Sequence, residues 1–169
     1  GDHRDLHSFP TRRSSDLDHI TLKNITFKNQ GTSYSQKIVL SGALDSVTID
    51  NNKFLGYQGS SSSDHASIYG SGADATGLKI KNNTYTDGGG FAIYLDSDNE
   101  SSPPTGLEIS SNTFTDTYSG IFSHYYDGVI IRVNTIVVSH MLDKRIYLFY
   151  FDFVNVIEVD YLNSTDLDR

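Results

Sequence analysis

Charged side chains recur at equivalent positions of five similar octapeptides, and these are the residues whose types and spacing could support chemistry. The octapeptides begin at Ile20, Val47, Leu78, Leu107 and Val129. The candidates at their second and fourth positions are Asp50, Lys79, Lys81, Glu108 and Arg132. A carboxylate can take a proton as a general base, and a nearby cation can neutralise an anionic substrate. We therefore treat these five side chains as a candidate binding surface, and we assign no catalytic residue.

The octapeptides share an apolar pattern that predicts short strands. All five are apolar at positions one, three and eight, and four of them carry Asn at position six (Asn52, Asn83, Asn112 and Asn134). Apolar and polar residues mostly alternate over the first four positions, which is the period of a strand with one buried face. The octapeptides begin 27, 31, 29 and 22 residues apart, a spacing typical of stacked repeats.

A second β-rich segment lies about midway between successive octapeptides, at residues 38–40, 67–69, 92–95 and 121–122. Two or three short strands per repeat, stacked in parallel, predict an all-β right-handed parallel β-helix (β-solenoid). We expect about five coils and a fragment of a longer solenoid. The third-position residues should form one buried column (Leu22, Ile49, Ile80, Ile109 and Ile131). The Asn column should lie at a turn, because Asn tolerates the left-handed backbone region and stacked amides can bond one another.

In these repeats and turns, residues 18–136 resemble the right-handed parallel β-helix proteins of the pectate-lyase-like superfamily. The resemblance implies a secreted or cell-surface protein with a polysaccharide partner, related to lyases and epimerases of uronate polymers. If the protein is an enzyme, the resemblance implies a polysaccharide lyase, an epimerase or a glycoside hydrolase. On this interpretation the five candidate residues contact the polymer, because clefts in such proteins commonly follow an outer strand face.

A non-catalytic adhesin-like or wall-binding surface solenoid is the competing class. Repeats, many Asn, Ser and Thr residues and no dedicated acid–base set are typical of it. The same charges would then only stabilise the sheet: Lys23, Asp50 and Lys81 are expected to stack as alternating charges, and Lys79 to stack on Glu108. Both classes stay open at this point.

Residues 36–58 are also similar in spacing to a stretch of the pectin methylesterases. That similarity implies oxyanion-stabilising roles for Gln36 and Gln58. The acid–base Asp of that family should follow Gln58, but the residue here is Gly59, and residues 66–70 lack the expected nucleophilic Asp. Ester hydrolysis by that mechanism needs both carboxylates, so this activity is disfavoured.

Asp87 and Asp116 each follow the eighth-position aromatic residue by two, in the phrases NNTYTD and SNTFTD. Stacking would put these carboxylates on adjacent rungs, where their repulsion raises one pKa unless a cation or donor intervenes. One prediction is therefore a weak Ca²⁺ site at Asp87 and Asp116, and Ca²⁺ is the only cofactor that the sequence suggests. A hydrogen bond from Thr86 or Thr115 is an alternative. Side chains that point apart into water, where screening weakens the repulsion, are another.

Composition narrows the remaining classes. The chain has 13 Lys and Arg against 21 Asp and Glu, a net charge of −8, which argues against nucleic acid as a partner. It has no Cys, which excludes a disulfide framework and a thiolate metal site. No run approaches the roughly 18 apolar residues of a membrane span, so membrane insertion is not expected. The oligomeric state is not predicted.

Both ends of the chain are expected to differ from the repeats. Residues 1–17 resemble a translated short-read sequencing adapter, so we expect them to be extraneous and any signal peptide to have been lost upstream. Residues 137–169 lose the repeat pattern. A degraded repeat, a terminal cap and an out-of-frame tail are the open explanations for them.

Overall fold

The computed structural model describes residues 19–29, 31–56, 62–87, 91–117 and 120–137, and the backbone of 158–159 and 163–164. Within these ranges the chain consists of short strands and turns, with a 3₁₀ helix at Ser63–His65 as the one helical element. The segment predicted to be extraneous, residues 1–17, lies outside the described residues. So does most of the segment after residue 137.

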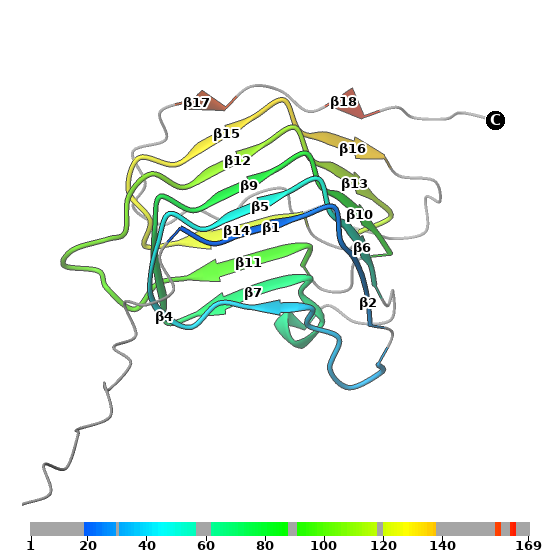
Figure 1. Cartoon of the computed structure of the whole chain (residues 1–169), viewed down its shortest axis with the longest axis horizontal. Helices are drawn as coiled ribbons and strands as arrows, with labels where there is room; N and C mark the ends of the chain where they lie inside the picture. The colour runs from blue at the N-terminus through cyan, green and yellow to red at the C-terminus, as the bar shows by residue number, and fades with distance from the viewer. Residues whose placement is uncertain are drawn as a thin grey trace, which may run out of the picture.

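The described strands form three parallel sheets and a two-stranded ribbon (Figure 1). The first sheet contains β1 (Thr21–Lys23), β5 (Thr48–Asp50), β9 (Lys79–Lys81), β12 (Glu108–Ser110), β15 (Ile130–Arg132) and β17 (Glu158–Val159). The second contains β2 (Thr26–Lys28), β6 (Lys53–Leu55), β10 (Thr84–Thr86), β13 (Thr113–Thr115), β16 (Thr135–Val137) and β18 (Asn163–Ser164). The third contains β3 (Ile38–Val39), β7 (Ile68–Ser71), β11 (Ile93–Asp96) and β14 (Ile121–His124). The ribbon pairs β4 (Gly42–Asp45) with β8 (Ala73–Thr76).

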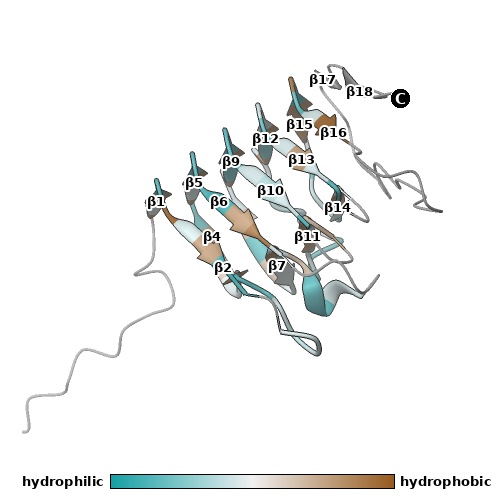
Figure 2. Ribbon diagram, turned by 90° about the vertical axis from the view of Figure 1, so that its right-hand side faces the viewer, coloured by the Kyte–Doolittle hydropathy of each residue, from teal (hydrophilic) through white to brown (hydrophobic). Residues whose placement is uncertain are grey.

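The octapeptides supply the first two sheets, and the midway segments supply the third. Figure 2 shows the rungs following one another from β1 through β5, β9 and β12 to β15. Strand pairing joins equivalent third-position residues from Leu22 through Ile49 to Ile131. Four of these residues are at most 1% exposed, whereas Leu22, on the edge strand β1, is partly buried. The predicted all-β parallel β-helix and its apolar column are therefore confirmed.

The eighth-position residues form a second buried column inside the second sheet. The rings of Phe27, Phe54, Tyr85 and Phe114 stack with centroid distances of 5.1, 4.8 and 4.9 Å and nearly parallel planes. Ring stacking at this distance follows from the separation of parallel strands, which is about 4.8 Å. Phe54, Tyr85 and Phe114 are fully or almost fully buried, so this column contributes much of the apolar core.

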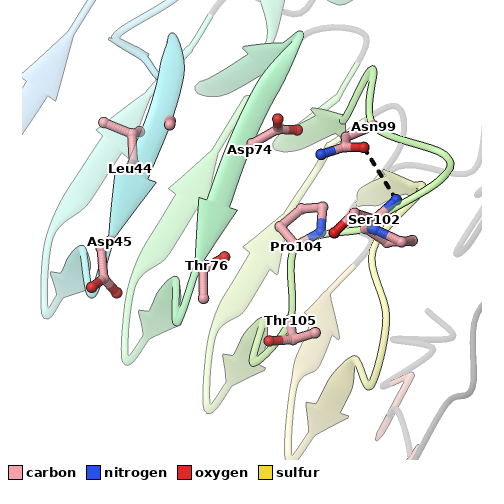
Figure 3. A pocket seen from close by; sticks show the side chains of 10 residues that line it. Leu44, Asp45, Asp74, Thr76, Asn99, Ser102, Pro104 and Thr105 are labelled. Atoms are coloured by element: carbon pink, nitrogen blue, oxygen red, sulfur yellow. Dashed lines mark hydrogen bonds between the residues drawn. The ribbon is translucent and has the colours of Figure 1, made fainter. Parts of the chain in front are cut away.

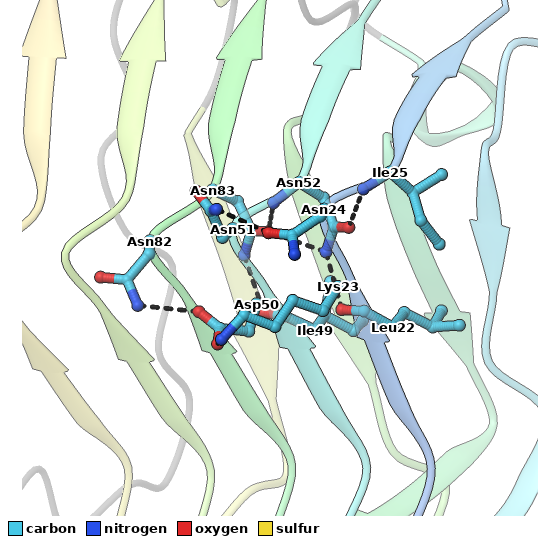
Figure 4. A network of polar contacts seen from close by, with 10 residues as sticks. All are labelled: Leu22, Lys23, Asn24, Ile25, Ile49, Asp50, Asn51, Asn52, Asn82 and Asn83. Atoms are coloured by element: carbon cyan, nitrogen blue, oxygen red, sulfur yellow. Dashed lines mark hydrogen bonds and ion pairs between the residues drawn. The ribbon is translucent and has the colours of Figure 1, made fainter.

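The Asn column is a continuous hydrogen-bonded ladder between the first and second sheets (Figure 4). Asn83 shows the repeating unit: its Nδ2 donates to the Ile49 carbonyl (2.9 Å) and to Asn112 Oδ1 (3.1 Å). Its own Oδ1 accepts from the backbone N–H of Asn52 at 2.8 Å. Each buried amide thus forms hydrogen bonds with backbone groups that the turn would otherwise leave unpaired. A buried polar group without a hydrogen bond destabilises the fold by about 1–3 kcal/mol.

The left-handed backbone position is one residue earlier than the Asn ladder, which corrects the expectation for these turns. The positive φ angles fall on Asn24, Asn51, Asn82, Ser111 and Val133, at 52–60°. The ladder residues that follow have ordinary φ angles and point inward. A ladder amide needs its side chain inside the core, and the bend that directs it there is made by the residue before it.

The turn at Val133 carries a conformational cost, because a β-branched residue disfavours a φ of 53°. Its side chain is 59% exposed, so no core packing offsets this cost. We expect Val133→Asn to raise the free energy of unfolding by about 1 kcal/mol, measured by urea denaturation. Ser111→Val, at the equivalent exposed turn, should lower it by a similar amount. Unchanged stability in both variants would contradict this explanation.

The Tyr85 hydroxyl is fully buried and has no hydrogen-bond partner among the described residues. Phe occupies the equivalent position in three other coils. Burial raises the pKa of this phenol well above its ordinary value. We expect Tyr85→Phe to raise the free energy of unfolding by about 1 kcal/mol, because it removes an unpaired polar group. Tyr126→Phe is the matched control: its buried hydroxyl donates to the Ala73 carbonyl at 2.8 Å, so the same change should be destabilising. Thermal or urea unfolding of both variants measures whether the free energy of unfolding rises for Tyr85→Phe and falls for Tyr126→Phe.

Candidate functional site

The outward side chains of the first sheet form a charged face, defined by Lys23, Asp50, Lys79, Lys81, Glu108 and Arg132. They point away from the core because the residues between them fill it. Strand pairing brings Lys23, Asp50 and Lys81 into one row. It also places Lys79 opposite Glu108. The predicted stacking of these charges is therefore correct, and the five candidate residues share one surface.

Asp50 is held by two donors on neighbouring coils (Figure 4). Lys23 Nζ lies 2.8 Å from Oδ2, and Asn82 Nδ2 donates to Oδ1 at 2.8 Å. These neighbours cover the carboxylate, so Asp50 is 7% exposed although it lies on the outer face. The hydrogen bonds from Asn82 and Lys23 lower the pKa of Asp50 below its ordinary value, because both stabilise the ionised form.

Glu108 is similarly engaged, but its cation comes from a diagonal position. Arg132 Nη2 donates to Glu108 Oε1 at 2.9 Å, and Ser110 Oγ donates to the same oxygen at 3.0 Å. Partial burial opposes ionisation of Glu108, but the bonds from Ser110 and Arg132 outweigh it and lower the pKa. Both carboxylates of the charged face therefore stay ionised at neutral pH and are weak bases.

Lys79 and Lys81 differ from the other cations of this face. Neither makes a hydrogen bond or an ion pair within 4 Å among the described residues, although Glu108 and Asp50 lie in the neighbouring rungs. Lys79 is exposed and Lys81 is half-buried. Strand β9 thus presents two ammonium groups that a bound anion can reach.

Asp87 and Asp116 lie on adjacent rungs, as their shared phrase predicted. Thr86 pairs with Thr115, and the Asp87 N–H donates to the Thr115 carbonyl at 3.1 Å. Both Asp residues have left-handed backbone, with φ of 51° and 52°, and Asp is among the residues that tolerate it. Among the described residues no three His, Asp or Glu side chains gather as a metal-ligand group. The Ca²⁺ site stays a prediction.

The glutamines of the methylesterase comparison have ordinary structural surroundings where they are described. Gln36 Nε2 donates to the Ser63 carbonyl at 3.4 Å. Gln58 and Gly59 lie outside the described residues. Residues 66–70 run into β7, and the disfavoured esterase activity stays a prediction.

A second outer surface was missed by the sequence analysis. We call it the aromatic face, and its members are Val39, Tyr69, Phe91, Tyr94 and Phe122 with the polar residues Ser71, Asp96 and His124. Pairing in the third sheet aligns Val39, Tyr69, Tyr94 and Phe122 in one outward row. The signal was present in the tetrapeptides IYGS, IYLD and IFSH, each with a ring at its second position.

The polar row of this face contains an Asp–His pair. His124 Nδ1 lies 2.8 Å from Asp96 Oδ1, and the Tyr94 hydroxyl donates to Asp96 Oδ2 at 3.4 Å. Desolvation, assisted by the Asp96 charge, raises the pKa of Tyr94 to about 12. The phenol therefore keeps its proton at neutral pH and remains a hydrogen-bond donor.

A groove of about 670 Å³ lies beside the two-stranded ribbon (Figure 3). It is lined by β4 and β8 and by the loop that contains Asn99, Ser102 and Pro104. Asp74 points into this region and accepts a hydrogen bond from Ser97 Oγ at 2.6 Å. Because Ser97 directly follows Asp96, the groove wall at Asp74 is linked to the end of β11.

The parallel coils, the Asn ladder and the outward rows together define a parallel β-helix with two distinct outer faces. A family model described as a right-handed β-helix region matches residues 9–136, and the chain belongs to that family. No curated protein and no solved structure matches the chain significantly. No helix in the described ranges is long and apolar enough to cross a membrane.

The pairing of Asp50 predicts a pH-dependent contribution to stability. Its pKa is lower in the folded than in the unfolded chain, so the contribution is present above the unfolded value of about 3.9 and is lost as the pH falls through the folded value. Asp50→Asn should therefore lower the free energy of unfolding by about 1 kcal/mol near neutral pH. The difference from the wild type should shrink as the solution is acidified.

Urea unfolding at several pH values measures this effect. Glu100→Gln is the control, because Glu100 is exposed and lies outside the charged face. A deficit of Asp50→Asn that is the same at neutral and acidic pH would count against the ion pair as its source.

Proposed function

We propose that this right-handed β-helix is a secreted or cell-surface protein that binds an acidic polysaccharide, such as a uronate polymer, on its charged face. The observation that carries the proposal is the pair of outward ammonium groups on β9, Lys79 and Lys81, which lack a close partner among the described residues. A polymer that carries one carboxylate per sugar can supply a counter-charge to each. Three further members of the face, Asp50, Glu108 and Arg132, would contact sugar hydroxyls at its margins.

The charged face supports binding better than it supports catalysis. A lyase- or epimerase-like reaction on uronates requires a base close to the sugar C5 atom. Asp50 and Glu108 are each held by a cation and a second donor, and their lowered pKa values make them weak bases. Of the two classes open from the sequence, this face therefore favours a wall-binding or adhesin-like solenoid over a polysaccharide-processing enzyme.

The double variant Lys79→Ala/Lys81→Ala tests the proposal. We expect its affinity for polygalacturonate to fall about ten-fold, because two ion pairs of up to about 1 kcal/mol each are lost. The wild-type affinity should weaken as salt is added, because these exposed charges are screened. Affinity electrophoresis or calorimetry measures both effects.

Lys28→Ala/Lys53→Ala is the matched control, since it removes the same charge from the exposed residues of β2 and β6. This variant should keep most of the wild-type affinity. An equal loss in both double variants would mean that net charge alone governs binding. Wild-type protein that does not bind polygalacturonate would refute the proposal.

A further inference from the structure

The groove beside the two-stranded ribbon exists because one coil departs from the repeat. Strands β4 and β8 pair side by side in two successive coils, whereas the next coil has the loop 97–105 at the equivalent place. The loop returns to register at Thr105, whose carbonyl accepts from the Gly77 N–H at 2.8 Å. Before that point the loop projects from the coil (Figure 1), and the space between loop and ribbon is the groove of about 670 Å³. We call it the ribbon groove.

The floor of the ribbon groove carries two carboxylates at diagonal corners. Strand pairing sets Asp74 opposite Ala43. Two residues further along the same strands, Asp45 lies opposite Thr76. With strands about 4.8 Å apart and a rise of about 3.3 Å per residue, the backbone positions of the two Asp residues are about 8 Å apart. Figure 3 shows the two carboxylates at separate ends of the ribbon.

Hydrogen bonds hold these carboxylates at their separate ends. Ser97 Oγ donates to Asp74 Oδ1 at 2.6 Å, which holds Asp74 beside the loop. Ser46 Oγ donates to Asp45 Oδ1 at 2.8 Å. To share one Ca²⁺ ion, whose oxygen ligands lie about 2.3–2.6 Å away, the two side chains would have to turn toward each other. Two separate cationic groups fit this arrangement better than one metal ion.

The negative charge of the ribbon groove is not neutralised from within. Neither Asp45 nor Asp74 forms an ion pair within 4 Å in the described part of the chain. No Lys or Arg is among the residues that line the groove. Asp98 and Glu100 are exposed on the loop and add charge of the same sign. Because opposite charges attract and like charges repel, the groove favours a cationic ligand over an anionic one.

The surface between the two carboxylates is partly apolar. Ala43 lies on the floor, and Pro103 and Pro104 line the groove from the loop. These side chains can pack against methylene groups and remove them from water. The hydroxyls of Thr76 and Ser102 also line the groove and can accept hydrogen bonds from an ammonium group. A ligand that is cationic at both ends and apolar in between therefore matches the lining.

We propose that the ribbon groove binds a linear aliphatic diamine or polyamine. One ammonium group binds Asp45, a second binds Asp74, and the methylene chain between them lies across Ala43. The site goes beyond the proposed function, because it uses another surface of the β-helix and takes a ligand of opposite charge. The two sites therefore succeed or fail separately.

An NMR titration of ¹⁵N-labelled protein with 1,4-diaminobutane and with spermidine tests the site at neutral pH and low salt. We expect saturable shifts of the backbone amides of Asp45, Asp74 and Thr76, with a Kd below about 1 mM. 1-Aminobutane is the matched ligand, because it has the same methylene chain and one ammonium group. It should bind at least about ten-fold more weakly, since it can pair with only one carboxylate at a time.

The double variant Asp45→Asn/Asp74→Asn should weaken diamine binding about ten-fold, since it removes both counter-charges. Circular dichroism and thermal unfolding identify a variant that fails to fold. Asp45→Asn alone keeps the test decisive in that case, because Asp45 is exposed, and it should weaken binding about three-fold. Asp87→Asn/Asp116→Asn is the matched control: it removes the same charge outside the groove, and Asn tolerates the left-handed backbone at both positions.

The control variant and Lys79→Ala/Lys81→Ala should bind the diamine like the wild type, whatever the result with polygalacturonate. Equal losses in the two Asp double variants would overturn the site, because net charge alone would then govern binding. Equal affinities for 1-aminobutane and 1,4-diaminobutane would overturn the two-centre arrangement. Absence of saturable shifts at the groove would refute the proposal, as would Ca²⁺ that displaces the diamine at equal concentration.

Discussion

The hydrogen-bonded Asn ladder is the interaction on which the rest of this structure depends. Each buried amide needs the amide of the next coil, at about one strand separation, to satisfy its donors and acceptors. A coil that slipped by one residue would leave these groups unpaired in the core and would also turn its apolar residues outward. The ladder therefore sets one register for the isoleucine column and for the aromatic column.

That register also organises the outer surface. Because equivalent residues stack along the axis, any side chain that recurs in the repeats becomes a row, and a row suits a ligand that itself repeats. The first sheet carries alternating charges and the third carries rings. These two faces belong to different sheets of each coil, so their chemistry is set independently. A β-helix can in this way present two chemically different outer faces on one core.

Pairing within the charged face decides which of its residues remain available. Asp50 and Glu108 each gain a cation and a second donor from nearby positions, and this lowers the pKa of both. Lys79 and Lys81 keep their ammonium groups free of close partners among the described residues. The carboxylates of the charged face are therefore engaged in bonds within the sheet, whereas the lysines of β9 are the members on which the proposed function rests.

The repeat pattern of the sequence was sufficient to predict the β-helix, the isoleucine column, the stacked Asn amides and the stacking of Lys23 on Asp50. All of these follow from equivalent positions in successive octapeptides, and a regular fold stacks equivalent positions. Contacts between residues that do not occupy equivalent positions of the octapeptides could not be predicted in this way. Asn82 covers Asp50 from the turn of another coil, Arg132 reaches Glu108 diagonally, and His124 meets Asp96 across 28 residues. The ring row was missed because its strands lie in segments of variable spacing, where a single aromatic residue shows no period. Only the tertiary structure brought these residues together, because side-chain direction and the rung on which each strand falls determine which groups meet.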